Sequence, residues 1–182
     1  MALRRLPSAP IRAGALLLTA LAMTGCALDR DPPPGGQPSF YENLAQTGGQ
    51  VDEAAAASMI SGYRRNNGLG AVTIDADLTR IAAQQSRAMA SSDKLDHSLT
   101  KPFVQRLKAG GYDAKIAAEN IGAGYHTLAE AFSGWRDSPS HRENMLLKGA
   151  NRIGIAVAHA PKSKYRVYWT LILAAPDDKP RS

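Results

Sequence analysis

The chain has 182 residues, 44% of them hydrophobic, a length that suits one domain with a core of ordinary size. Its single cysteine excludes an intramolecular disulfide and every zinc site that needs two thiolates. Residues 1–25 contribute three arginines and no acid to the formal charge of +6, so the remaining chain is nearly balanced and no nucleic-acid partner is predicted.

The first 25 residues are predicted to be a signal peptide that directs export by the general secretory route to the cell envelope. Three arginines precede an apolar run over residues 13–23, which is shorter than the ~20 residues of a membrane-spanning helix. The run is followed by Thr-Gly and then Cys26, which resembles the lipobox of bacterial lipoproteins. The resemblance implies acylation of Cys26, for example with palmitate, and a membrane tether, at the outer membrane if the cell has two. An ordinary signal peptide with an incidental cysteine is the alternative.

The composition divides the remaining chain into a tether, a domain and a tail. Residues 26–50 contain proline and glycine clusters and no periodic apolar pattern, so they are predicted to be a lipidated tether. The domain is predicted over residues 51–176, and the charged residues 177–182 are predicted to be a tail.

Capping residues and apolar residues at helical spacing predict four helices in the first two thirds of the domain. They run over residues 52–66, from Asp75 or Asp77 to Met89, over 102–109, and from Thr127 to Trp135, and one more helical turn starts at Ser140. Thr127 is followed three residues later by an acid, Glu130, which is the pattern of a capping box. The start of the fourth helix is therefore the most clearly marked.

The apolar period then changes to two residues, which indicates strands. Residues 153–157 and 167–172 alternate in this way and are joined by a short turn, so they predict an antiparallel hairpin. A weaker third strand is predicted within 115–123. The expected fold class is therefore α+β, with helices on a small three-stranded antiparallel sheet.

Four sequence motifs follow one another in the predicted domain. They are Asp96-His97-Ser98, Ala118-Glu119-Asn120-Ile121-Gly122, the segment from Trp135 to Leu146, and Ile153-Gly154-Ile155-Ala156 with the later Tyr168-Trp169. Together they resemble the CAP superfamily of cysteine-rich secretory proteins, antigen 5 and pathogenesis-related proteins, in its compact bacterial form (the SCP domain). The resemblance covers about residues 52–175 and implies an α-β-α sandwich, in agreement with the predicted helices and strands.

The resemblance also implies a cleft lined by two histidines and two acids. The histidines correspond to His97 and His141 and the first acid to Glu119. The second acid normally lies three residues after the residue matched by Trp135, and this position is Ser138 here. Because the acid pair is incomplete, no catalytic residue is assigned.

Two neutral imidazoles, here His97 and His141, can bind a divalent metal ion through their ring nitrogens. A carboxylate such as Glu119 can then orient one ring or act as a general base toward metal-bound water. With only two protein ligands, zinc is expected to bind weakly, and no cofactor is expected to be required. The alternative is a buried His–Glu pair that only stabilises a loop.

Three functions stay open at this point. The favoured one is a lipid-anchored envelope protein whose cleft binds a small ligand, a lipid or a peptide. The others are a metal-assisted hydrolase that acts on peptide or cell-wall material, and an interaction or structural protein with a vestigial cleft. The expected partners are the membrane, through the lipid anchor, and a small ligand or another envelope component.

Overall fold

The structure is a computed structural model, and it describes residues 36–177. The predicted signal peptide, the predicted acylation site Cys26 and residues 178–182 of the predicted tail lie outside the described residues. Within residues 36–177, no helix is both long enough and apolar enough to cross a membrane.

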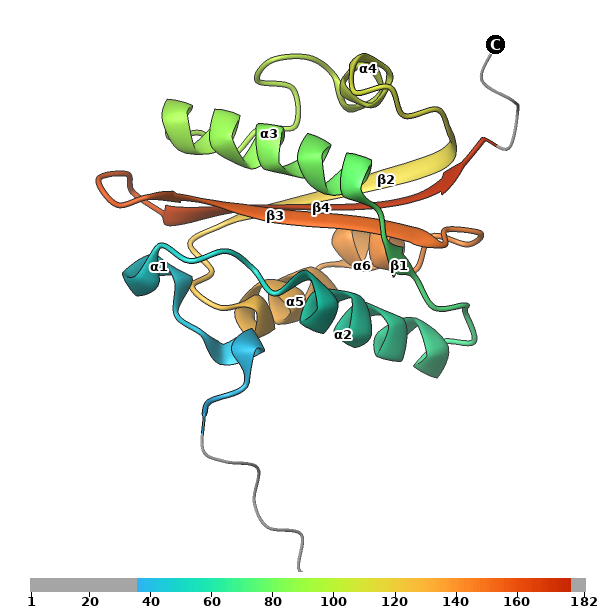
Figure 1. Cartoon of the computed structure of the whole chain (residues 1–182), viewed down its shortest axis with the longest axis horizontal. Helices are drawn as coiled ribbons and strands as arrows, with labels where there is room; N and C mark the ends of the chain where they lie inside the picture. Colours follow the sequence, from blue (N-terminus) through green and yellow to red (C-terminus); the bar gives the residue numbers. More distant parts are fainter. Residues whose placement is uncertain (1–35, 178–182) are drawn as a thin grey trace, which may run out of the picture. The chain divides into compact units, whose positions relative to one another are not determined.

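The described residues form three layers, with helices on both faces of one β-sheet (Figure 1). In chain order the elements are η1 (Ser39–Tyr41), α1 (Leu44–Thr47), α2 (Glu53–Asn66), β1 (Thr73–Ile74), α3 (Ala76–Ser92), α4 (Phe103–Ala109), β2 (Ala114–Ala123), α5 (Leu128–Asp137), α6 (Pro139–Met145), β3 (Arg152–Ala160) and β4 (Arg166–Pro176). Helices α3 and α4 cover one face of the sheet, and α2, α5 and α6 cover the other (Figure 1). This is the layered arrangement that the sequence predicts.

The sheet has four strands in the order β1-β3-β4-β2, so the expected three-stranded antiparallel sheet is wrong in strand number and in direction. The predicted hairpin is present as β3 and β4, and β2 pairs with β4 in antiparallel register. The additional strand β1 pairs in parallel with β3 through Thr73 and Ile74. Two residues are too few to show a period of two, which is why the sequence pattern does not reveal this strand.

Side-chain caps explain where the three longest helices begin. The carboxylate of Asp52 accepts a hydrogen bond from the backbone at the start of α2, and Asp75 does the same for α3. Thr127 and Glu130 form a reciprocal capping box at the start of α5. All three starts agree with the sequence prediction, because a cap depends only on residues within one helical turn.

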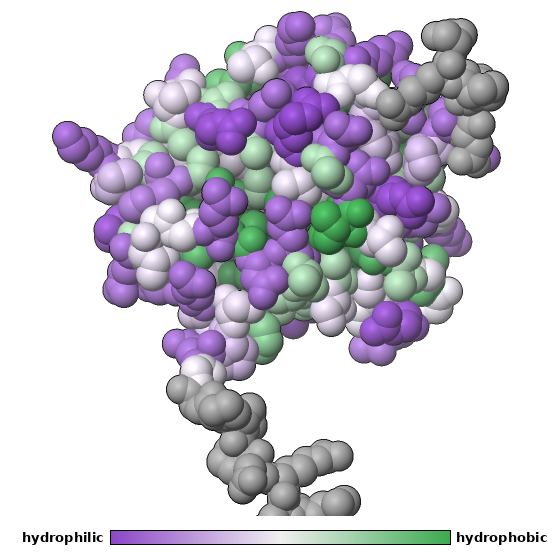
Figure 2. Space-filling model, viewed as in Figure 1, coloured by the Kyte–Doolittle hydropathy of each residue, from purple (hydrophilic) through white to green (hydrophobic). Residues whose placement is uncertain are grey.

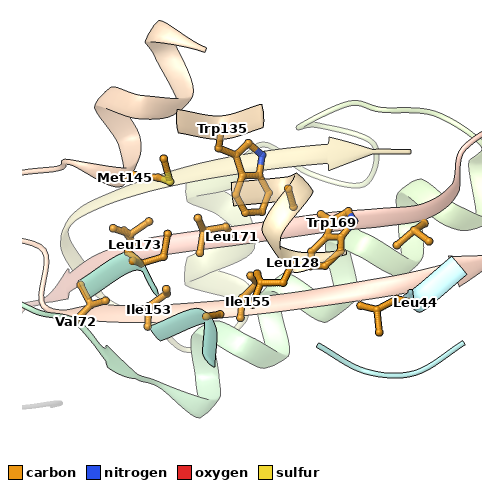
Figure 3. Packing of buried hydrophobic residues seen from close by; sticks show 14 of the residues in the cluster. Leu44, Val72, Leu128, Trp135, Met145, Ile153, Ile155, Trp169, Leu171 and Leu173 are labelled. Carbon is orange, nitrogen blue, oxygen red and sulfur yellow. The ribbon is translucent and has the colours of Figure 1, made fainter. Parts of the chain in front are cut away.

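The hydrophobic core lies on both faces of the sheet. Its largest cluster, between the sheet and helices α2, α5 and α6, includes Trp135 and Trp169, which pack edge to face with ring centroids 6.4 Å apart (Figure 3). On the other face, Leu78 of α3 packs with Ile172 of β4. A side chain at Gly154 would collide with the backbone of α3, so this glycine permits the close approach of helix and strand.

A short segment around α1 also belongs to the core. Leu44 and Ala45 are only 3% and 2% exposed, and they join the cluster that contains Trp169. Nε2 of His159 and the guanidinium of Arg166 lie 3.1 and 3.2 Å from the carbonyl oxygen of Ala45. The packed part of the chain therefore reaches back into residues 26–50, which the composition predicts as a tether. A helix of four residues is too short to show helical periodicity.

Few large apolar side chains are exposed among the described residues. They are Tyr41, Ile74, Leu95 and Val104. On the face shown in Figure 2, hydrophilic residues predominate and hydrophobic ones lie between them. Single exposed apolar residues are ordinary on protein surfaces, so they do not by themselves mark a docking surface.

Candidate functional site

The candidate site is organised around the carboxylate of Glu119 on β2, which is buried with 2% of its side chain exposed. Nη2 of Arg106 lies 2.7 and 2.6 Å from its two oxygens. Nδ1 of His97 lies 2.8 Å from Oε1 of the same carboxylate. Because an ionised carboxylate only accepts hydrogen bonds, Nδ1 of His97 is the donor in this contact, and in the neutral form of the ring Nε2 keeps its lone pair.

Arg106 is the residue of this network that the sequence analysis missed. It lies on α4, is 6% exposed, and also donates to the carbonyl oxygens of Lys101 and His97, at 3.2 and 3.1 Å. Its guanidinium lies 5.4 Å from the ring centroid of Phe103. The one sequence signal was its spacing of three residues from Phe103, which places both side chains on the same side of the helix.

His97 lies in the loop between α3 and α4, and this loop is held at several points. Asp93 begins it in the left-handed backbone region, with φ 48°, and accepts a hydrogen bond from the hydroxyl of Tyr168. Further on, Nε2 of Gln85 donates to the carbonyl of Asp96 at 2.7 Å. The His97 side chain is 50% exposed. The backbone is therefore fixed while the ring is open to solvent.

His141 comes from α6, on the opposite face of the sheet. Its carbonyl oxygen accepts a hydrogen bond of 2.9 Å from the side chain of Asn120. Nδ2 of Asn144, also on α6, donates to Oδ1 of Asn120 and to the backbone oxygen of Glu119, at 2.9 and 3.1 Å. Burial lowers the pKa of His141, and the charge of nearby His97 lowers it further. Both histidines therefore approach the same stretch of β2.

The free edge of β2 is closed by side chains at this point. The backbone oxygen of Glu119 is bound by Asn144, and that of Ile121 accepts a hydrogen bond of 3.2 Å from Nε1 of Trp135. An open strand edge can pair with another chain, so these two contacts protect it. The site thus lies at the sheet edge where the two helical layers meet.

Ser138, matched to the missing acid, lies between α5 and α6. It occupies the position before the first residue of α6, but its side chain makes no capping hydrogen bond. Helix α6 begins at Pro139 instead of near Ser140, because a proline in the first turn needs no hydrogen-bonded N–H. Within residues 36–177, no hydrogen bond joins Ser138 to the carboxylate of Glu119, and its role in the cleft stays a prediction.

The metal-binding capacity of the site is limited by the number of available ligands. Among the described residues, no three His, Cys, Asp or Glu side chains lie close enough to hold a metal ion together. Glu119 is already engaged by Arg106 and His97. Because zinc sites in proteins have three or four protein ligands, metal binding by the pair His97 and His141 stays a prediction.

The fold and the order of these motifs define a class of protein, and comparison with known proteins identifies it. Residues 57–173 match the family described as CAP, the cysteine-rich secretory protein family. The chain belongs to this family, which confirms the resemblance found in the sequence.

Individual relatives are bacterial. The chain is 30% identical over 106 residues to the uncharacterized protein YkwD of Bacillus subtilis strain 168, a match that covers 57% of this chain and 41% of that protein. The chain therefore spans less than half of the length of this relative.

Two solved structures share the fold. An extracellular protein containing an SCP domain from Bacillus anthracis strain Ames matches with a TM-score of 0.59 and 21% identity, over 66% of this chain and 39% of that one. An outer surface protein of Borrelia burgdorferi matches with a TM-score of 0.61 and 18% identity, over 71% of this chain and 98% of that one. At these identities, the likeness concerns the fold.

Proposed function

We propose that the chain is an exported binding module of the bacterial cell envelope, and that its ligand contacts His97 and His141. The observation that carries this proposal is the engagement of Glu119 by Arg106 and His97. Both oxygens of this buried carboxylate accept hydrogen bonds from Arg106, and one of them also accepts from His97. This geometry suits a carboxylate that orients the ring of His97.

The ligand chemistry follows from the histidine pair. With Nδ1 of His97 directed at Glu119, Nε2 is free to accept a hydrogen bond or to bind a metal ion. A small polar group of a lipid or peptide, or a weakly held zinc ion at His97 and His141, matches these donors and acceptors. The extracellular and outer surface relatives support the proposed location in the envelope.

Zinc titration by calorimetry tests the role of the histidines. We expect weak binding at pH 7.5 and at least about tenfold weaker binding by His97→Ala, because one of two ligands is lost. Binding should decline as the pH falls, because a protonated imidazole has no lone pair. The lowered pKa of His141 keeps that ring neutral to a lower pH than the ordinary value of 6.5.

The matched control is His126→Ala, which should bind zinc as the wild type does. Equal binding by wild type and His97→Ala would show that these rings are not the ligands. Hydrolysis of peptide or cell-wall material by the purified chain, abolished by Glu119→Gln, would replace the binding proposal with a hydrolase.

We also propose that acylated Cys26 anchors the chain to a membrane, on the basis of the lipobox resemblance. One acyl chain binds a membrane only marginally, whereas two or more anchor a protein stably. Cys26→Ser should therefore move the protein from the membrane fraction to the soluble fraction and abolish labelling by palmitate. Gln37→Ala, a change outside the lipobox, should leave both unchanged. Membrane retention of Cys26→Ser would contradict the anchor.

A further inference from the structure

A hollow of about 400 Å³ lies at the end of the sheet where β2 begins and β4 ends. Its lining comes from Lys115 and Ile116 of β2, from Lys148, Gly149 and Asn151 of the loop after α6, and from the end of β4. Lys115 precedes Glu119 by four residues, which corresponds to roughly 13 Å along a strand. The hollow is therefore separate from the histidine pair.

The ionisable side chains that line this hollow are all positive. Lys115 and Lys148 reach it from two different elements, and neither ammonium forms an ion pair with any residue in 36–177. The nearest acids along the chain, Asp113 and Asp177, lie beyond the strand ends and do not line it. Both lysines are exposed, and an anion that enters the hollow between them is attracted by both charges.

A buried arginine is hydrogen-bonded to the same loop. Arg64 of α2 is 1% exposed and forms no ion pair within the described part of the chain, so no carboxylate neutralises its charge locally. Its guanidinium donates to the carbonyl oxygens of Met145, Leu147 and Ala150 at 2.9, 3.0 and 2.8 Å. Lys148 and Gly149, which line the hollow, belong to the same loop as Leu147 and Ala150.

We propose that this hollow binds a phosphate group, as a phosphomonoester or a phosphodiester. Lysine ammonium groups bind phosphate as point charges, and two of them line this hollow. The hollow is larger than a phosphate ion, and Ile116 and Pro176 provide apolar surface for the organic part of the ligand.

Titration of glycerol 3-phosphate into the full chain carrying Cys26→Ser, followed by amide NMR, tests this proposal. We expect saturable shifts at Ile116, Lys148 and Gly149. The double variant Lys115→Glu/Lys148→Glu should bind at least about tenfold more weakly, since two attractive charges become repulsive. The matched control Lys108→Glu/Lys162→Glu has the same net charge and should bind as the parent chain does.

Vesicles of phosphatidylglycerol distinguish the possible sources of the phosphate. Co-sedimentation that is lost only in Lys115→Glu/Lys148→Glu would identify a lipid headgroup. Saturable binding of glycerol 3-phosphate without co-sedimentation would identify a soluble or polymeric phosphate ligand. Equal behaviour of the two double variants, or no saturable binding in either assay, would overturn the proposal.

Discussion

Arg64→Met is expected to lower the free energy of unfolding by about 3–5 kcal/mol, because it removes the donors that satisfy buried carbonyl oxygens. Arg64 donates to four backbone oxygens, those of Gly70, Met145, Leu147 and Ala150, from a side chain that is almost fully buried. Methionine fills much of the volume but has no donor. Burial lowers the pKa of Arg64, but an arginine side chain stays charged at neutral pH, so the wild-type contacts persist there.

Urea unfolding with linear extrapolation measures this loss. The control is Arg65→Met, the neighbouring arginine, which is exposed and should change stability by no more than about 0.5 kcal/mol. Arg64 also donates to the carbonyl oxygen of Met145 at the end of α6. The variant should therefore broaden the NMR signals of that helix, which carries His141. Equal midpoints for the two variants would show that the carbonyl oxygens find other donors.

Arg106→Met should cost a similar amount, about 3–5 kcal/mol, for a different reason: it leaves the buried charge of Glu119 without its cation. The side chains of Arg106 and Glu119 are 6% and 2% exposed, so water cannot replace the lost partner well. The same change removes the donors to the carbonyls of Lys101 and His97, and the loop that presents His97 should become more mobile. The affinity for zinc should fall as this loop becomes more mobile.

A double-mutant cycle separates the ion pair from general packing. Arg106→Met combined with Glu119→Met replaces both charges with apolar side chains, and it should recover most of the stability lost in Arg106→Met alone. Zinc binding should not recover, because His97 would still lack the acceptor that orients it. Strictly additive losses of stability would mean that the two side chains are not energetically coupled.

Local patterns predicted much of this fold, because the forces that define them act within a few residues. The caps at Asp52, Asp75 and Thr127 and the alternation of β3 and β4 were all visible in the sequence. The ordered motifs also led to the family, which the match to residues 57–173 confirms. They pointed to His97 and Glu119 as well, which the structure brings into contact.

Other features of the fold depend on contacts between segments that are distant in the chain, and only the tertiary structure shows them. Strand β1 and helix α1 are too short to have a period, so only their partners define them. Arg64 and Arg106 are charged side chains that local patterns assign to the surface. Burial of these arginines is favourable only because the fold brings carbonyl oxygens and a carboxylate within hydrogen-bond distance of each guanidinium.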